Sequence, residues 1–211
     1  MKLFKGRQFY SIKLNTFLLL ICFASFSMAT ALFADSNRLD KLSEEIQKQY
    51  PQATIIRKNF FSDEIRKYAK PPELVTGDFD CNGLKDTVLQ IYHEGKIIII
   101  IVYRFKGKES KIVEIGASGE MPLDSIQGRY EDYITLRKKG QRVEFYCNCG
   151  NDDTNYEDQE LCRKHADRKS ERGCSLNLDC DAIEEIYDGK AAVLYYFDRK
   201  TNKYSSVVTA D

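Results

Sequence analysis

The feature that most constrains the fold is a run of six β-branched residues, Ile97–Val102. β-Branched side chains favour strands, and a strand that is apolar at every position has to be covered on both faces. The run is too short to cross a membrane, which needs ~20 residues, and it would promote aggregation if it were exposed. It therefore predicts a central strand of a sheet.

Further segments rich in β-branched and aromatic residues flank this run, each bounded by turn residues. The predicted strands are Leu74–Phe79, Thr87–Tyr92, Lys96–Phe105, Lys111–Ile115, Tyr133–Leu136, Val143–Cys147, Ala182–Tyr187, Ala191–Phe197 and Tyr204–Thr209. Links such as Glu94-Gly95 and Asp188-Gly189 are short enough for hairpins. Such links favour an antiparallel meander over parallel strands joined by helices.

Two helices are predicted ahead of the strands. Asn37–Tyr50 has apolar residues at helical spacing and is closed by Pro51. Ser62–Ala69 begins with a cap residue and acidic residues in its first turn, and two prolines follow it closely. The sequence therefore predicts an α+β fold, a mostly antiparallel β-sheet with two N-terminal helices.

Residues 1–34 have the three parts of a secretory signal peptide. Basic residues up to Lys13 precede a short apolar core, and Ala29-Thr-Ala31 matches an A-x-A cleavage site. An uncleaved membrane anchor is the alternative, because Thr16–Ala34 is nearly long enough to span a bilayer. Serines and alanines dilute its second half, which favours cleavage between Ala31 and Ala34.

The remaining residues, 35–211, have the length of a single domain. We expect them to be periplasmic or secreted, with no further membrane segment. The leader holds four of the 32 basic residues and none of the 32 acidic ones, so the rest carries a net charge of −4. Because nucleic-acid binding needs clustered Lys and Arg, this charge does not favour it. A hydrophobic share of 43% excludes wholesale disorder.

The cysteines are interpreted from the expected compartment. Six follow the leader: Cys81, Cys147, Cys149, Cys162, Cys174 and Cys180. An even number in an oxidising compartment predicts three disulfides, whose pairing stays open. Five of the six lie within 147–180, which predicts an exposed insertion held by disulfides rather than by a core of its own. The alternative is a zinc site formed by Cys147, Cys149, Cys162 and His165.

One segment carries ligand chemistry, with the spacing D-x-D-x-N-G-x-x-D. A hard cation such as calcium takes six to eight oxygen ligands, which a tight loop supplies by turning alternate side chains inward. The candidate ligands, one of them a backbone carbonyl, are Asp78, Asp80, Asn82, Leu84 and Asp86. Gly83 permits the sharp turn that such a loop needs. Leu89 stands where a helix–loop–helix calcium site has a bidentate Glu, so the loop is not of that type.

The run Gly77-Asp78-Phe79-Asp80, followed by Asn82-Gly83, resembles the Asp-rich loop of FG-GAP and VCBS-type repeats. In that family the loop joins β-strands and binds calcium, so the resemblance implies a structural calcium ion here. The sequence departs from the family at Cys81, where Gly is usual, and it contains no second copy, so the family's propeller is not expected. The C-terminal part from Asp181 also looks like small exported bacterial proteins of unknown function. The alternative is a metal-free turn, because Asp, Asn and Gly also cap backbone groups in hairpins.

Catalytic motifs are sparse in this sequence. It has two histidines, His93 and His165, and no G-x-S-x-G, H-E-x-x-H or P-loop. Glu184 and Glu185 are adjacent on a predicted strand, so they should point to opposite faces. These features favour a non-enzymatic calcium-binding or interaction domain with a protein or glycan partner. The alternative is a small carboxylate-based hydrolase, or an inhibitor of one, because catalytic acids need not be close in sequence.

Overall fold

A computed structural model of the chain describes residues 39–104, 110–147, 156–167, 169–188 and 190–210. The expected signal peptide lies outside these ranges. No helix within them is long and apolar enough to cross a membrane. The chain divides into two units, residues 1–49 and 50–211. In the first, residues 39–49 are helical, and Leu39, Leu42 and Ile46 are buried, as their spacing predicts.

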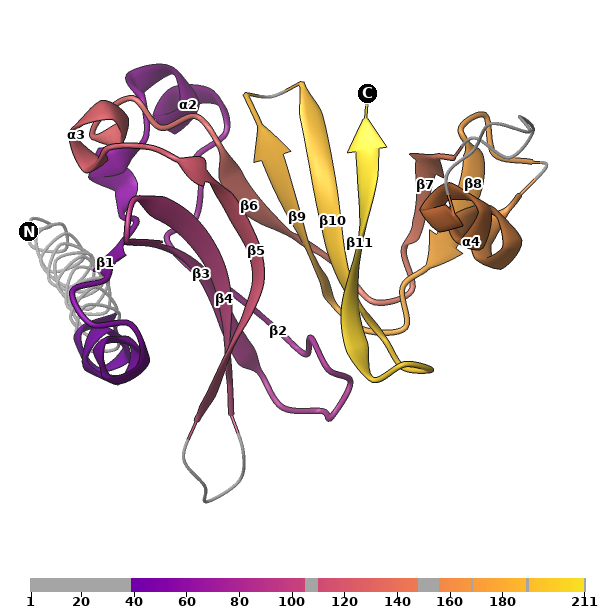
Figure 1. Cartoon of the computed structure of the whole chain (residues 1–211), viewed down its shortest axis with the longest axis horizontal. Coiled ribbons are helices and arrows are strands. Elements are labelled where there is room, and N and C mark those ends of the chain that lie inside the picture. Colours follow the sequence, from indigo (N-terminus) through magenta and orange to yellow (C-terminus); the bar gives the residue numbers. More distant parts are fainter. Residues whose placement is uncertain (1–38, 105–109, 148–155, 168, 189, 211) are drawn as a thin grey trace, which may run out of the picture. The chain divides into compact units, whose positions relative to one another are not determined.

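The second unit is built mainly of antiparallel strands (Figure 1). The first sheet has the order β1-β3-β4-β5, with β2 also paired to β3: β1 Thr54–Ile55, β2 Val75–Gly77, β3 Asp86–His93, β4 Lys96–Tyr103 and β5 Lys111–Glu120. The second sheet has the order β11-β10-β9-β6: β6 Tyr133–Arg137, β9 Ala182–Tyr187, β10 Ala191–Asp198 and β11 Lys203–Ala210. Every named strand pair is antiparallel, which confirms the predicted sheet type.

The helices in the described part of this unit are short. They are the 3-10 turn η1 Lys58–Phe60 and the α-helices α2 Asp63–Tyr68, α3 Leu123–Ile126 and α4 Tyr156–His165. The Ser62 hydroxyl accepts the N–H of Ile65 at 3.2 Å and caps α2, as predicted. Neither α3 nor α4 belongs to the N-terminal part, so helices are not restricted to that region.

The apolar run Ile97–Val102 lies in β4, which pairs with β3 on one side and β5 on the other. None of its six side chains is more than 7% exposed. The run is therefore a central, doubly covered strand, as its composition predicts.

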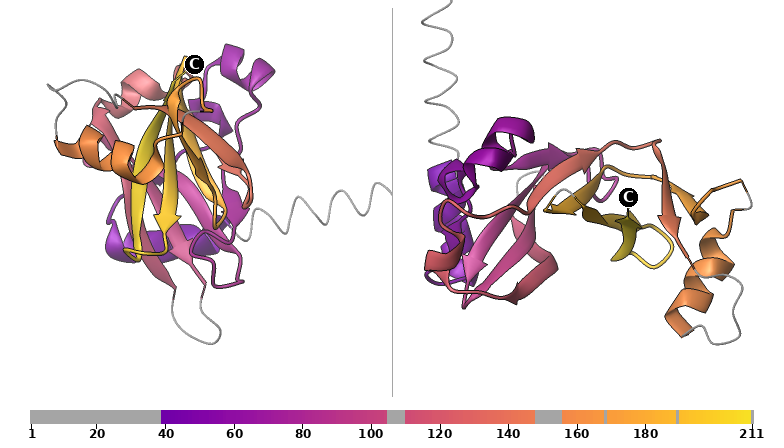
Figure 2. Two further views of the ribbon diagram at one scale, coloured as in Figure 1. Left: turned by 90° about the vertical axis from the view of Figure 1, so that its right-hand side faces the viewer. Right: turned by 90° about the horizontal axis from the view of Figure 1, so that it is seen from above.

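The first and second sheets pack against each other through a shared apolar core (Figure 2). Phe79, Ile101 and Val88 come from the first sheet and its β2–β3 link, and Ile134 and Ile183 come from the second. The Tyr195 side chain lies directly against the backbone of Gly116. A Cβ added at Gly116 would lie 2.5 Å from the Tyr195 hydroxyl, so this contact requires glycine.

The chain between β6 and β9 leaves the second sheet, so β6 pairs with β9 and the strands are not a simple meander. The described residues of 138–181 contain β7 Arg142–Tyr146, α4 and β8 Gly173–Asn177, and we call them the arm. β7 pairs with β8, and α4 contacts β8 (Figures 1 and 2). The disulfide Cys147–Cys174 joins the ends of this ribbon.

The arm has an apolar core, which corrects the expectation that disulfides alone would hold it. Phe145 and Cys174 are fully buried, and Phe145 and Leu176 pack with Leu194 and Tyr196 of β10. Apolar residues alternate with polar ones along β7 and β8, which places them on one face toward the second sheet. Sequence reasoning missed β8, because the alternation of apolar and polar residues in this strand is short and lies next to charged residues.

Candidate metal site

The Asp-rich segment forms the link between β2 and β3 in the first sheet. Gly77 pairs with Asp86 at the end of the β2–β3 ladder, so the residues between them make a closed loop. Asp86 begins β3 and is fully buried, whereas Asn82 and Gly83 are exposed at the tip. The sequence expectation of a loop between two strands is therefore confirmed.

Side chains of the loop bond to its own backbone and curl it. Asp80 Oδ1 accepts the N–H of Asn82 at 3.1 Å, and Asn82 Oδ1 accepts the N–H of Leu84 at 2.7 Å. Asp78 Oδ2 accepts the N–H of Gly83 at 3.0 Å across the loop. Cys81 and Gly83 both have positive φ, at 61° and 81°. A positive φ is uncommon for a residue other than glycine, and Cys81 also forms a disulfide with Cys180.

Three of the five predicted ligands converge. Carboxylate oxygens of Asp78, Asp80 and Asp86 lie within 4.8 Å of one another. Among the described residues Asp78 Oδ1 is buried and has no hydrogen-bond partner. A buried carboxylate oxygen without a partner is unfavourable unless a cation or a water meets it. For Asn82 and Leu84 the structure records local turn contacts, so their role as ligands stays a prediction.

Asp86 is the buried acid of the loop. Burial raises the pKa of its carboxyl to about 6, and the nearby charges of Asp80 and Asp78 add to this effect. The N–H groups of Arg104 and Phe79 donate to Asp86 at 3.2 and 3.3 Å and act in the opposite sense. A cation beside the three carboxylates would relieve their mutual repulsion and favour the ionised form. Oxygen donors without thiolate or imidazole suit a hard cation such as calcium.

Asp181 anchors the loop to the base of the arm, and sequence reasoning missed this residue. Its Oδ2 accepts the N–H of Asp78 at 3.1 Å, and its Oδ1 accepts the N–H of Lys139 at 3.0 Å. The disulfide Cys81–Cys180 joins the same two segments. Both contacts tie the loop to the exit of the arm, and Asp181 in turn binds Lys139 at the entry. The one local indication of this anchoring role in the sequence is that Asp181 directly follows a cysteine.

The cysteines among the described residues form disulfides, which are typical of proteins outside the cytoplasm. Cys81 pairs with Cys180, Cys147 pairs with Cys174, and Cys162 is also disulfide-bonded. Cys149 lies outside the described residues. The zinc alternative needed Cys147 as a thiolate, and its disulfide removes that ligand. His165 packs edge-on against Phe145, and burial lowers the pKa of its imidazole.

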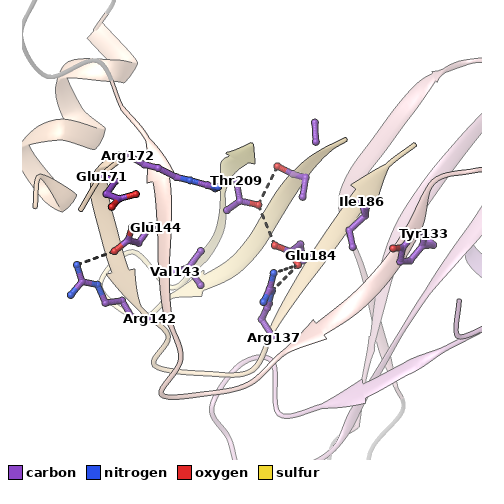
Figure 3. A pocket seen from close by; sticks show the side chains of 12 residues that line it. Tyr133, Arg137, Arg142, Val143, Glu144, Glu171, Arg172, Glu184, Ile186 and Thr209 are labelled. Atoms are coloured by element: carbon purple, nitrogen blue, oxygen red, sulfur yellow. Dashed lines mark hydrogen bonds and ion pairs between the residues drawn. The ribbon is translucent and has the colours of Figure 1, made fainter. Parts of the chain in front are cut away.

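A second polar region lies between the arm and the outer face of the second sheet (Figure 3). It is a cavity of about 520 Å³. On the sheet, Glu184 is only 3% exposed and accepts hydrogen bonds from Arg137 Nε at 2.7 Å and from the Thr209 hydroxyl at 3.2 Å. Glu185 points to the other face, where the Tyr195 hydroxyl donates to it at 3.0 Å. The prediction that these two glutamates face opposite ways is confirmed.

Comparison with known proteins adds no relative from which a role could be transferred. No protein family, curated protein or solved structure matches this chain. The loop and the cavity therefore have to be interpreted from their own chemistry.

Proposed function

We propose that this chain is an exported, periplasmic or secreted, non-enzymatic domain that binds calcium in the loop Asp78–Asp86. The ion would be structural and would stabilise the loop at the base of the arm. A protein or glycan would then be bound elsewhere on the domain.

The observation that carries the proposal is the buried Asp78 Oδ1, which has no partner among the described residues and belongs to a cluster of three carboxylates. Both oxygens of Asp86 already accept backbone N–H groups, and so does Asp78 Oδ2. One buried oxygen is left over at the point where Asp80 and Asp86 come close. A divalent cation there would satisfy that oxygen and neutralise the cluster.

Calcium is preferred over other cations for two reasons. The available donors are oxygens, and calcium accepts irregular sets of six to eight, whereas magnesium demands near-ideal octahedral geometry. The loop also resembles the calcium loop of FG-GAP and VCBS-type repeats at Gly77–Asp80 and Asn82–Gly83. Cys at position 81 is compatible with the loop conformation, because Cys81 adopts a positive φ here while it is bonded to Cys180.

The test is a calcium titration of chelator-treated protein, followed by calorimetry and thermal unfolding. Extracellular calcium modules commonly bind with Kd ~10⁻⁴–10⁻³ M. At 100 times Kd the ion should stabilise the folded state by about 2.7 kcal/mol. Asp78→Asn keeps an acceptor for the Gly83 N–H but removes the charge, so it should abolish most of this stabilisation.

The matched control is Asp179→Asn, an exposed acid at the base of the arm that does not belong to the cluster. Its calcium response should equal that of the wild type. If millimolar calcium releases no heat and leaves the melting temperature unchanged, the loop is a metal-free turn and the proposal fails.

A carboxylate-based hydrolase is the second candidate function. It is favoured by Glu144, Glu171 and Glu184, which line one cavity away from the loop. Against it, both oxygens of Glu184 already accept hydrogen bonds, from Arg137 and Thr209. Release of reducing ends from oligosaccharides, lost in Glu171→Gln, would support this candidate over the non-enzymatic one.

A further inference from the structure

The cavity between the arm and the second sheet has the size of a ligand site. Its volume of about 520 Å³ falls within the ~300–1,000 Å³ of small-molecule pockets. Phe145 and Leu176 of the arm pack against Leu194 and Val207 on the same sheet face, and the polar cavity lies beside this apolar contact.

Both walls of the cavity carry charged groups. On the sheet, the Arg137–Glu184 ion pair stands beside the Thr209 hydroxyl. On the other wall, Figure 3 shows the Arg172 side chain extending from the arm toward the sheet. A guanidinium has five N–H donors, so the contacts of Arg137 with Glu184 do not exhaust it. Arginine side chains therefore supply hydrogen-bond donors to the cavity from both the sheet and the arm.

The charges of this lining cancel. Three arginines are matched by three glutamates, which are Arg137, Arg142, Arg172, Glu144, Glu171 and Glu184. Two pairs are formed within the lining, Arg137 with Glu184 and Arg142 with Glu144, and Arg142 also pairs at 2.7 Å with Asp167, which does not line the cavity. A balanced lining gives no net attraction to an anion or a cation. It does offer charged hydrogen-bond donors together with the carboxylates of Glu144 and Glu171 as acceptors, while both oxygens of Glu184 are already used.

A hydroxyl group both donates and accepts, so a ligand with several hydroxyls can use the two kinds of group at once. Apolar side chains also line the cavity: Ile186 and Ala192, which are paired across β9 and β10, and Val143 of the arm. A pyranose ring combines a rim of hydroxyls with an apolar C–H face, and it fits both features. We propose that this cavity binds a neutral saccharide segment of two or three residues. The site is separate from the calcium loop.

The test measures saccharide binding in millimolar calcium, by saturation-transfer NMR and calorimetry. The neutral probes are maltotriose, cellotriose and triacetylchitotriose, and the anionic probe is trigalacturonate. At least one neutral probe should bind, and trigalacturonate should bind no more tightly. Arg172→Gln should weaken binding about tenfold or more, because it removes charge-assisted hydrogen bonds. The matched control Arg129→Gln changes an exposed arginine that does not line the cavity, and it should leave the affinity unchanged.

A second variant, Ala192→Leu, narrows the cavity from the sheet side, and its melting temperature establishes that it is folded. It should also abolish binding. The proposal is overturned if no neutral trisaccharide binds up to about 10 mM, or if trigalacturonate alone binds. It is also overturned if Arg172→Gln and folded Ala192→Leu keep the wild-type affinity. Since Asp78→Asn should remove calcium binding and leave saccharide binding, failure of one proposal is distinguishable from failure of the other.

Discussion

The carboxylate of Asp181 accepts the backbone N–H of Asp78, a residue 103 positions earlier, at 3.1 Å. The other oxygen of Asp181 accepts the N–H of Lys139. One side chain therefore joins the first acid of the candidate loop to both ends of the arm, and the disulfide Cys81–Cys180 reinforces the same junction. Stability of the loop and position of the arm should depend on each other.

Asp181→Ala should lower the free energy of unfolding by about 2–3 kcal/mol, because it leaves two backbone N–H groups without their charged acceptor. The side chain is only 13% exposed, so water cannot fully replace it. Urea denaturation measures the effect. Asp179→Ala, at an exposed position two residues away, should stay within about 0.5 kcal/mol of the wild type. Equal losses in the two variants would argue against the junction.

Peptide mapping without reduction should recover Cys81–Cys180 and Cys147–Cys174, with no free thiol in the native protein. Cys162 is bonded, and of the six cysteines after the leader only Cys149 is left for it. We therefore predict a Cys149–Cys162 peptide. Alkylation of two or more cysteines in the native protein would refute this pattern.

The two described disulfides should differ in their contribution to stability. Cys81–Cys180 spans 99 residues and Cys147–Cys174 spans 27. Since cross-links that close longer loops restrict the unfolded chain more, we expect losses of about 4.7 and about 3.5 kcal/mol for the paired Ser variants. Denaturant unfolding of the two variants gives the comparison, and an inverted order would contradict it.

The pH dependence of the metal-free protein should reveal Asp86. Its pKa is about 6 in the folded protein and 3.8 as the ordinary value, so the folded state binds the proton more tightly. The resulting stabilisation, about 2–3 kcal/mol, is fully present below pH 3.8 and is lost as the pH rises through 6. Unfolding free energies measured in chelator across this range, as a difference from Asp86→Asn, isolate the contribution.

Saturating calcium provides the control for this titration. The cation favours ionised Asp86, so the loss of stability between pH 4 and 6 should shrink or reverse when calcium is present. If the free energy of unfolding varies with pH in the same way with and without calcium, the ion does not affect the ionisation of Asp86.

Gly116→Ala should destabilise the packing of the two sheets by about 1–3 kcal/mol, because the new methyl group would overlap the Tyr195 ring. Gly119→Ala lies in the same strand and has no atom within 4 Å of the added Cβ, so it should be close to neutral. Thermal unfolding compares the two. In a Tyr195→Leu background the cost of Gly116→Ala should fall, and the absence of this coupling would refute the contact.

Features with a short sequence range were determined by the sequence itself. Successive side chains of a strand point to opposite faces, so β-branched apolar residues at every position of Ile97–Val102 make both faces apolar and predict a central strand. The cap at Ser62 and the turn between β2 and β3 depend on hydrogen bonds that span three to five residues. Such contacts form within one segment, so local residue order is enough to predict them.

Only the tertiary structure decided which distant segments meet. Asp181 reaches Asp78 across 103 residues, Cys81 selects Cys180 among five candidates, and Arg137 finds Glu184 across 47. The arm leaves the second sheet after β6 and returns at β9, which creates the cavity on that sheet's outer face. No local pattern encodes these partners, because they depend on sheet order and on the packing of side chains that lie far apart in the sequence.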